Sequence, residues 1–352
     1  MDSTYTGKYG QLKALTTEFL TSDFIEQLEQ KAPDEFLKTL SSTSYRKDVD
    51  AFSALYKIPD LVEVVLNAHA MRMVRNVYMA VPPAAHDFII AYTSKWDVEN
   101  IKLILSSKKL GYSVESTETF LMVQRNVPVG VISGPISMDE YKTIIAQKDI
   151  ESVVAALARH GYGTVLMKYL DEALRTGDIS EMIVALDIAY YDRLVSALKF
   201  YNGDEGLLIR YIRDMIDIKN VTSVLKAISF GYKDVGNYLV RGGNMTAAKL
   251  TEMSTKSIED LKKDMPFSID DAFEMYSRDP FLTYFEVALK RALYSKYIGL
   301  FDESGISIAS MMVFMIRAEM ERDELRLAWL NRYYGVSMER IENIKILKKI
   351  NK

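Results

Sequence analysis

Residues 96–112, WDVENIKLILSSKKLGY, have the pattern of an amphipathic helix that ends at a glycine. Ile101, Ile104 and Leu105 recur at helical spacing, so they place an apolar stripe along one face. Gly111 follows at the point where a left-handed residue can close a helix at little steric cost. The stretch therefore predicts one helix with a buried face and a glycine at its carboxyl end.

The same pattern recurs in residues 217–232, DIKNVTSVLKAISFGY, and in residues 321–336, ERDELRLAWLNRYYGV. Alignment of Gly111, Gly231 and Gly335 brings apolar positions of the three stretches into register. Residues at these shared positions are expected to be buried. They are Ile101, Ile104, Leu105, Val221, Val224, Leu225, Leu325 and Trp329.

Three acidic residues also coincide in this alignment: Asp97, Asp217 and Glu321. An acidic side chain in the first turn of a helix interacts favourably with the helix dipole. We therefore interpret the three acids as residues near the starts of their helices.

A second helix is expected upstream in each copy. Leu66, Leu186 and Leu289 occupy equivalent positions there, and they precede the closing glycines by 45, 45 and 46 residues (66 to 111, 186 to 231, 289 to 335). Three copies with nearly constant spacing predict an all-α protein built from three homologous domains. The predicted domains are 1–127, 128–243 and 244–352.

Proline and glycine mark the expected breaks between helices. Residues 9–30 have the pattern of a first helical region, and Pro82-Pro83 must separate two helices of the first copy, because proline lacks an amide donor. Residues 120–135 and 238–244 predict connectors between the domains, the first of them extended. Ser137 is a candidate N-cap for the first helix of the second domain.

The composition excludes several classes of protein. The chain has 352 residues and a formal net charge of −4, so it has no global basic field for nucleic acid. It has no cysteine, which excludes disulfides, thiolate nucleophiles and cysteine-ligated metals.

The amino-terminal residues lack the apolar region of a secretory signal. The apolar run 306–316 is too short to span a bilayer, which needs about 20 residues. Membrane association is therefore expected to be peripheral or through a partner.

The residues that carry chemistry form no recognisable site. His69, His86 and His160 are scattered over different predicted elements, and the glycine clusters 161–163 and 241–243 match no phosphate-binding motif. We assign no catalytic, cofactor-binding or metal-binding residue and expect no cofactor.

Aromatic and methionine side chains offer two interpretations. A stripe of methionines at helical spacing is typical of a compliant core, although it also suits an adaptable protein contact. The tyrosine pairs 190–191 and 333–334 are likewise core residues or partner contacts. The methionines of the stripe are Met311, Met312, Met315 and Met320.

The ordered set of motifs resembles the family that comprises the C subunits of archaeal rotary ATPases and the d subunits of vacuolar ones, in particular its archaeal branch. The similarity runs over essentially the whole chain. The segments that carry it are WDVENIKLILSSKKLGY (96–112), GDISEMIVALDIAYYDRL (177–194), LVRGGNM (239–245) and AEMERDELRLAWLNRYYGV (318–336).

This resemblance implies three pseudo-threefold-related helical domains arranged as a funnel. It implies a non-catalytic central-rotor adaptor of an ATP synthase, which joins the central shaft to the membrane rotor ring and transmits torque for ion transport and ATP synthesis. The implied partners are central-shaft subunits and rotor-ring proteolipid subunits at the cytoplasmic face of the cell membrane. Membrane association is expected only through the complex, and nucleic acid is not an expected partner.

An arginine that is frequent in the family is missing from this chain. Members often carry it between the apolar stripe and the closing glycine, where this chain has Ser106, Lys226 and Leu330. Contacts that this arginine makes in other family members are therefore not expected at Ser106, Lys226 or Leu330 of this chain.

The outer helix faces differ among the three copies. A coiled shaft is not threefold, so three equivalent domains must present unlike surfaces to hold it in one orientation. We interpret Lys102, Lys226 and Arg326 as candidate shaft-binding residues that act by electrostatic steering. An ordinary solvated face is the alternative.

Two other functions remain open from the residues alone. A helical enzyme would gather polar groups with perturbed pKa values in a pocket between domains. A soluble scaffold would show neither such a pocket nor rotary partners.

Overall fold

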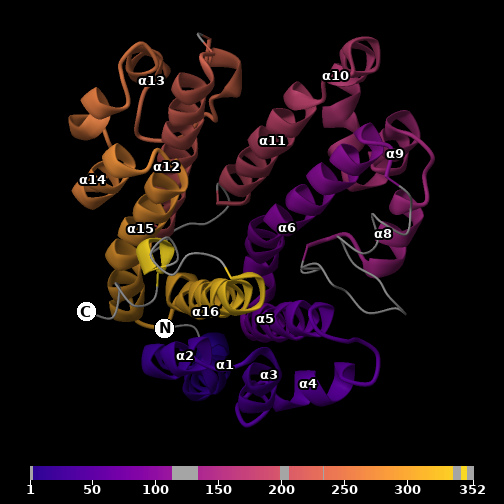
Figure 1. The fold of residues 1–352 in the computed structure, drawn as a ribbon, viewed down its shortest axis with the longest axis vertical. Coiled ribbons are helices and arrows are strands. Elements are labelled where there is room, and N and C mark those ends of the chain that lie inside the picture. The colour runs from indigo at the N-terminus through magenta and orange to yellow at the C-terminus, as the bar shows by residue number, and fades with distance from the viewer. Residues whose placement is uncertain (1–2, 113–133, 199–205, 233, 336–341, 347–352) are drawn as a thin grey trace. The chain divides into compact units, whose positions relative to one another are not determined.

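The computed structural model describes residues 3–112, 134–198, 206–232, 234–335 and 342–346. These residues form helices and no strand, as predicted (Figure 1). The chain divides into two compact units. The first unit contains residues 1–19 and 30–197, and the second contains residues 20–29 and 198–352.

The first unit is built from α-helices and short 3-10 helices (η). In chain order these are α1 (Ser3–Leu15), η1 (Thr16–Glu18), α3 (Pro33–Leu40), α4 (Arg46–Phe52), α5 (Asp60–Ala80), α6 (Pro83–Lys109), α8 (Met138–Ile145), α9 (Ile150–Ala156), η2 (Ala158–His160), α10 (Tyr162–Thr176) and α11 (Ser180–Leu198).

The second unit takes one short helix from near the amino terminus and the remaining helices from the carboxyl-terminal half. They are α2 (Ser22–Glu29), α12 (Gly206–Phe230), η3 (Gly236–Tyr238), α13 (Ala247–Met253), η4 (Glu259–Lys263), α14 (Asp270–Arg278), α15 (Thr283–Glu303) and α16 (Ile308–Tyr334).

Three pairs of long helices correspond to the three copies seen in the sequence. We call α5–α6 the first repeat, α11–α12 the second and α15–α16 the third. The second helix of each pair has 27, 25 and 27 residues, so it begins well before the stretch from which it was predicted. In the first repeat the start is set by proline, because α5 ends at Ala80 and α6 begins at Pro83, as Pro82-Pro83 predicted.

Glycine closes all three of these helices, as predicted. Gly111, Gly231 and Gly335 have φ of 71°, 74° and 65°, a backbone conformation that is strained for residues with a Cβ. Beyond the first two glycines, the amides of Tyr112 and Tyr232 donate to carbonyls five residues back, at 3.0 and 2.8 Å. This is the hydrogen bond of a Schellman motif, and it satisfies a carbonyl that the helix leaves open.

The predicted core is confirmed. All eight residues of the shared apolar positions are at most 1% exposed, and Leu66, Leu186 and Leu289 are fully buried. The methionine stripe at the start of α16 is also buried, which supports its interpretation as core. Of the tyrosine pairs, Tyr190 is buried, whereas Tyr333 is 39% exposed. Each repeat therefore buries the apolar stripe from which it was recognised.

Other helix boundaries also agree with the sequence. Ser137 caps α8 through a capping box, in which its hydroxyl accepts from the Glu140 amide and the Glu140 carboxylate accepts from the Ser137 amide. Residues 238–244 lie between α12 and α13, and Tyr238 ends the short helix η3. Most of the expected connector 120–135 lies outside the described residues. The division into three domains stays a prediction.

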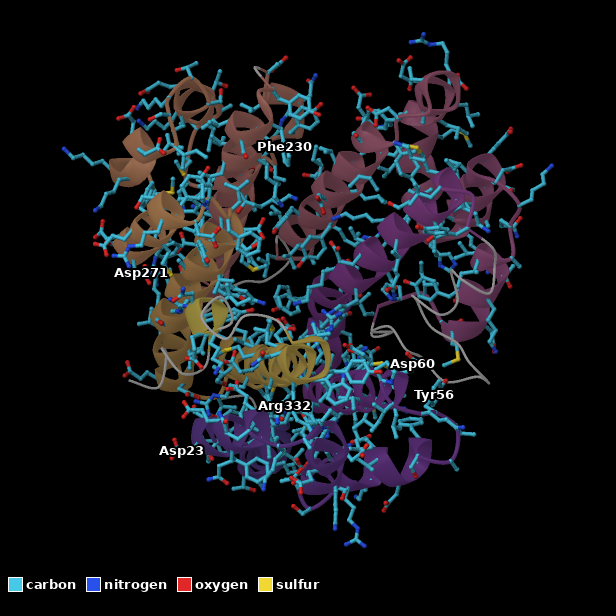
Figure 2. All side chains as sticks on the ribbon, in the orientation of Figure 1. Asp23, Tyr56, Asp60, Phe230, Asp271 and Arg332 are labelled. Carbon is cyan, nitrogen blue, oxygen red and sulfur yellow. The ribbon has the colours of Figure 1, made fainter. Side chains whose placement is uncertain are left out.

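The expected helical region 9–30 is helical and contains a break between two α-helices. The first, α1, ends at Leu15, and α2 begins at Ser22 and packs on α16 (Figure 1). Apolar spacing alone did not show this break. Asp23, at the start of α2, and Arg332, near the end of α16, are labelled in Figure 2.

The buried stripe gives a direct stability test. Leu105→Ala and Leu225→Ala should each lower the free energy of unfolding by roughly 2–5 kcal/mol, because each removes a fully enclosed side chain and leaves a cavity. Leu110→Ala is the matched control, because Leu110 is 63% exposed and should change stability by no more than about 0.5 kcal/mol. Urea unfolding of the three variants measures this, and equal effects at the buried and exposed positions would contradict the packing.

Candidate functional site

Three aligned acids lie buried in the middle of long helices rather than at their starts. Asp97 in α6, Asp217 in α12 and Glu321 in α16 are 0%, 2% and 3% exposed. The expectation of a first-turn position was therefore wrong. The cause is that each helix extends upstream of its repeated stretch, so the helix dipole does not explain the acids. A buried carboxylate must find hydrogen-bond donors within the protein.

Asp97 finds its donors in the segment that leads into α8. The Ile136 amide donates to one carboxylate oxygen at 3.3 Å, and the Tyr141 hydroxyl donates to the other at 2.6 Å. Tyr141 belongs to α8 and is itself fully buried. The acid of the first repeat thus holds the segment that begins the next part of the chain.

Asp217 does the same for the segment that leads into α13. The amides of Asn244 and Met245 donate to its two oxygens at 3.0 and 2.9 Å, and the Asn244 side-chain amide adds a contact at 3.0 Å. Nearby, Asn220 exchanges two hydrogen bonds with the backbone of Val240, so the same helix holds the connector at two points.

Glu321 completes the series with the segment that leads into α2. The Leu20 amide donates to Glu321 at 2.5 Å. Leu20, Ile136 and Met245 occupy equivalent positions, each directly before a hydroxyl residue that begins a short helix. We call each buried acid and the amides that it binds an acid clasp.

Glycine allows the first two acid clasps to close. A Cβ on Gly134 would lie 2.3 Å from the Asp97 carboxyl carbon, and a Cβ on Gly243 would lie 2.2 Å from an Asp217 oxygen. Both glycines stand two residues before the amide that the acid binds. In the third clasp that position is Glu18 and the acid is Glu321, whose side chain is one methylene longer.

The three acids are recognisable from the repeated sequence pattern, but the residues that bind them are not. Gly134 and Gly243 were visible only as connector residues, and Leu20 fell inside the expected helical region 9–30. The three partner segments do share a sequence pattern, which is an apolar residue, then a hydroxyl residue, then a short helix. This pattern identifies a partner segment only when the acid that binds it is known from the structure.

The structure places the predicted shaft-binding residues on three different helices. The Lys102 ammonium in α6 contacts Asp187 of α11 at 2.5 Å and Glu99 at 2.8 Å, and its side chain is 17% exposed. Burial by itself would lower the pKa of Lys102, but these two carboxylates outweigh it and raise the pKa. Lys102 therefore links the first repeat to the second.

Lys226 and Arg326 are more open to solvent. Lys226 in α12 is 53% exposed and lies 2.7 Å from Glu286 of α15, so it links the second repeat to the third. Arg326 is exposed on α16. Lys226 and Arg326 belong to the second unit and Lys102 to the first.

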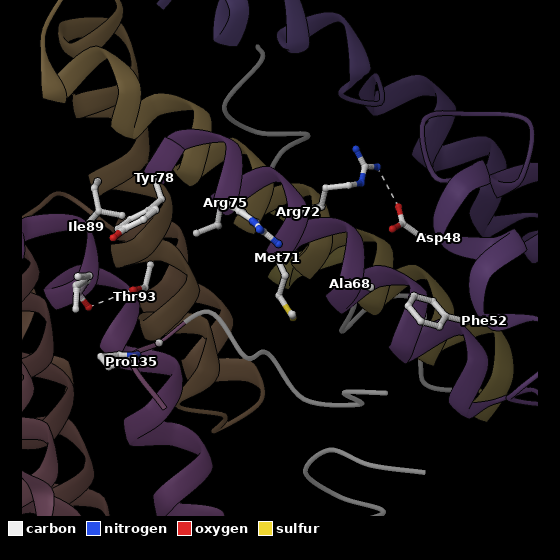
Figure 3. A pocket seen from close by; sticks show the side chains of 13 residues that line it. Asp48, Phe52, Ala68, Met71, Arg72, Arg75, Tyr78, Ile89, Thr93 and Pro135 are labelled. Carbon is white, nitrogen blue, oxygen red and sulfur yellow. Dashed lines mark hydrogen bonds and ion pairs between the residues drawn. The ribbon is translucent and has the colours of Figure 1, made fainter. Parts of the chain in front are cut away.

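A cavity of about 810 Å³ lies in the first unit between α4, α5 and α6 (Figure 3). Phe52, Met71 and Ile89 contribute apolar walls. At one side, Arg72 donates to Asp48 at 3.0 Å, and His69 lies 3.0 Å from the same carboxylate. Burial alone would raise the pKa of Asp48, but these hydrogen bonds hold it below its usual range. The charged cluster joins α4 to α5, which is a structural role.

Two of the three histidines stack on tyrosine rings. His69 stacks on Tyr45 at a ring separation of 3.7 Å, and His86 stacks on Tyr78 at 4.3 Å. Over the described residues, no group of three or more His, Asp or Glu side chains is placed to hold a metal ion. No helix in this part of the chain is long and apolar enough to cross a bilayer.

Comparison with known proteins identifies the family. The model of the ATP synthase (C/AC39) subunit family matches residues 9–344. The chain belongs to this family. It is 36% identical to the A-type ATP synthase C subunit of Thermoplasma volcanium, over 98% of this chain and 99% of the relative. Identity to the C subunit of Thermoplasma acidophilum is 35% over the same shares. For Methanocaldococcus jannaschii it is 23%, over 91% of this chain and 80% of the relative.

The family is a non-catalytic part of the rotary ATP synthase, so the chain is not an enzyme. This agrees with the sequence analysis, which assigned no catalytic residue. The three long-helix stretches that carried the resemblance lie within the matched residues 9–344. The acid clasps are therefore features of a protein whose function depends on structure and contacts rather than on a reaction.

Asp97 should give the protein a measurable dependence of stability on pH. Burial raises the pKa of Asp97 from 3.8 to about 7, although the hydrogen bonds from Tyr141 and Ile136 oppose this shift. Between these values the folded state holds a proton that the unfolded state has lost, so this group stabilises the fold less as pH rises. Asp97→Asn removes the titration. The free energy of unfolding of Asp97→Asn minus that of the native protein should therefore rise between pH 4 and 7 and stay constant above pH 7. Urea unfolding at several pH values measures this difference. A difference that does not change with pH would contradict a buried Asp97 with a raised pKa.

The close approach of glycine to the acid gives a second test. Gly243→Ala should destabilise the protein, because its methyl group would overlap the Asp217 carboxylate and force the connector away. Gly299→Ala is the control: Gly299 lies inside α15 with open space around it, so alanine should stabilise the helix by up to about 1 kcal/mol. Thermal unfolding of both variants measures this, and the same sign for both would exclude a role for the clasp.

Proposed function

We propose that the chain is the central-rotor adaptor of an A-type rotary ATP synthase. In this role it joins the central shaft to the membrane rotor ring and transmits torque between them, without catalysing a reaction. The observation that carries the proposal is the set of acid clasps, supported by the family and by the names of its relatives, which are C subunits of A-type ATP synthases. The clasps link parts of the chain that a torque would otherwise pull apart.

The clasps support a closed arrangement of three domains. Asp97 in the first repeat holds the segment leading into α8, and Asp217 in the second holds the segment leading into α13. Glu321 in the third holds Leu20, which precedes α2. A series in which the last member holds the first has a cyclic order. We propose that the domains 1–127, 128–243 and 244–352 follow this order around a funnel with pseudo-threefold symmetry.

A rotor adaptor needs stiffness against twisting, and two kinds of contact supply it. The first is close packing of the repeated apolar stripes, because protein interiors resist deformation. The second is the set of ion pairs that cross from one repeat to the next, Lys102 with Asp187 and Lys226 with Glu286. The first pair lies within the first unit and the second within the second unit, so each opposes sliding of neighbouring helices in its own unit.

The proposed partners follow from this role. One surface receives the central-shaft subunits, and another rests on the rotor-ring proteolipid subunits at the cytoplasmic face of the membrane. Contact with the membrane is through the complex. Binding is expected to involve broad surfaces rather than a cofactor or a small-molecule pocket.

Within the shaft contact we propose that Lys102, Lys226 and Arg326 provide positive charge. Arg326 and Lys226 both lie at the surface, where Lys226 is paired with Glu286. Lys102 is held by Asp187 and Glu99, so we propose that it acts at the edge of the contact while also linking two repeats. Helix faces that differ among the three repeats suit a shaft that lacks threefold symmetry.

The adaptor function predicts two independent contacts. The tagged chain should co-purify with the shaft subunits in the absence of the ring, and with the ring proteolipids in the absence of the shaft. Each complex should retain the chain without nucleotide, because no reaction is involved. Pull-down followed by gel analysis measures this, and a chain that binds only one of the two partners would not be an adaptor.

The three basic residues predict a salt-dependent affinity for the shaft. Lys102→Glu/Lys226→Glu/Arg326→Glu should weaken binding of the isolated shaft and flatten its dependence on salt, because rim charges act mainly through steering. Folding is checked by circular dichroism. Unchanged affinity and salt dependence in the folded variant would remove these residues from the interface.

A charge exchange separates the two roles of Lys102. The double variant Lys102→Asp/Asp187→Lys keeps an ion pair between α6 and α11 but removes positive charge from position 102. It should fold like the native chain and bind the shaft more weakly. If only the single Lys102→Asp variant is defective, Lys102 has a structural role alone.

A further inference from the structure

The three acid clasps are not equivalent in how the chain connects them. Asp97 and Ile136 are 39 residues apart, and Asp217 and Met245 are 28 residues apart, so in each case the chain runs directly from the acid to its partner. Glu321 and Leu20 are 301 residues apart. The third clasp therefore joins two ends of the chain that no short covalent connection holds together.

Extra interactions occur at this third position. The Lys345 ammonium lies 2.6 Å from the Glu29 carboxylate at the end of α2, and both side chains are almost fully buried, at 2% and 3% exposed. The same ammonium contacts Glu342 at 2.5 Å. A buried ion pair formed by residues 316 apart in sequence connects the amino-terminal helix to the carboxyl-terminal segment.

The carboxyl-terminal segment 342–346 is in turn held by two long helices. Arg291 of α15 donates to the carbonyls of Asn343 and Lys345 at 3.3 and 2.8 Å. Glu324 of α16 accepts from the Ile346 amide at 3.1 Å. The segment is thus fastened to the third repeat by its backbone, and Lys345 fastens α2 to the segment.

The three short helices bury equivalent residues. Leu28 in α2, Ile144 in α8 and Met253 in α13 each lie seven residues after the hydroxyl residue that begins the helix, and each is fully buried. We call α8 on α6 the first joint, α13 on α12 the second, and α2 with residues 342–346 on α16 the third. In the first two joints the short helix is the next described α-helix after its long helix in the chain, whereas in the third joint α2 and α16 lie nearly 300 residues apart and are held together by non-covalent contacts.

We propose that α2 and residues 342–346 form a non-covalent strap that closes the chain on its third repeat, and that the buried Glu29–Lys345 ion pair holds this strap shut when the protein is under torque. The carrying of torque rests on the proposed function, whereas the strap itself does not. A break in the ion pair leaves a charge buried without its partner, which strongly disfavours the closed state. Proteins open locally without unfolding as a whole, and we expect this opening where a segment is held by the fewest interactions.

Absence of cysteine makes the opening of each joint measurable. Leu28→Cys, Ile144→Cys and Met253→Cys each place one thiol at an equivalent buried position of the third, first and second joint. Under native conditions a maleimide reacts with such a thiol only when the joint opens. We expect the thiol at position 28 to react on the order of tenfold faster than the other two, because its joint opens without global unfolding.

Lys345→Met then tests the ion pair. In this background the thiol at position 28 should react faster still, while the thiols at 144 and 253 keep their rates. Glu29→Leu/Lys345→Met should restore slow labelling, because two apolar side chains can replace a buried ion pair. Lys142→Met, which removes the exposed Lys142–Asp139 pair, is the matched control. Equal labelling at all three positions, or equal acceleration at all three by Lys345→Met, would overturn the strap.

Transmission of torque is tested in the assembled ATP synthase. Lys345→Met should lower the ratio of ATP-driven ion transport to ATP hydrolysis, and Glu29→Leu/Lys345→Met should restore it. A normal ratio in an assembled complex whose strap is open would overturn the role under torque. If the native chain binds neither shaft nor ring, the proposed function fails, and the labelling result decides the strap independently.

Discussion

A carboxylate buried in the middle of a long helix is the constraint on which this structure depends. Water cannot reach it, and the helix has already used its own amides, so donors must come from another segment. In this chain Asp97, Asp217 and Glu321 take those donors from the backbone just before a short helix. The acid thus specifies which segment lies against which helix. The free energy lost when the carboxylate leaves water is offset only when that segment supplies its hydrogen bonds.

Repetition of this interaction gives a chain of three similar parts a defined order. Apolar stripes alone would pack on one another in several ways, because hydrophobic contact has no direction. The clasps are directional, since each needs an amide at a particular distance and, in two cases, a glycine that allows the backbone to approach. Such specificity is the best-attested role of polar groups in protein interiors. In the proposed adaptor it would keep the repeats in register during rotation.

Charge plays a different part on the helix surfaces. Lys102 and Lys226 were recognised as basic residues on faces that differ among the repeats, and both contact an acid of the following repeat. Their environments are unequal, because Lys102 is largely enclosed and Lys226 is half exposed. A lysine that links two repeats and also faces a partner would couple binding of that partner to the rigidity of the protein. Arg326, on α16, is exposed.

The sequence by itself determined the helical class, the three repeated helix pairs, the closing glycines and the buried stripe. Each of these follows from local spacing, such as the recurrence of Ile101, Ile104 and Leu105 and the left-handed conformation that Gly111 adopts. Tertiary structure alone decided the role of the aligned acids and the placement of Leu20 and Lys345. Their partners lie up to 316 residues away, and no periodicity along the chain encodes such a contact. The break before α2 was missed for the same physical reason: the Leu20 amide is bound by Glu321, a residue near the other end of the chain.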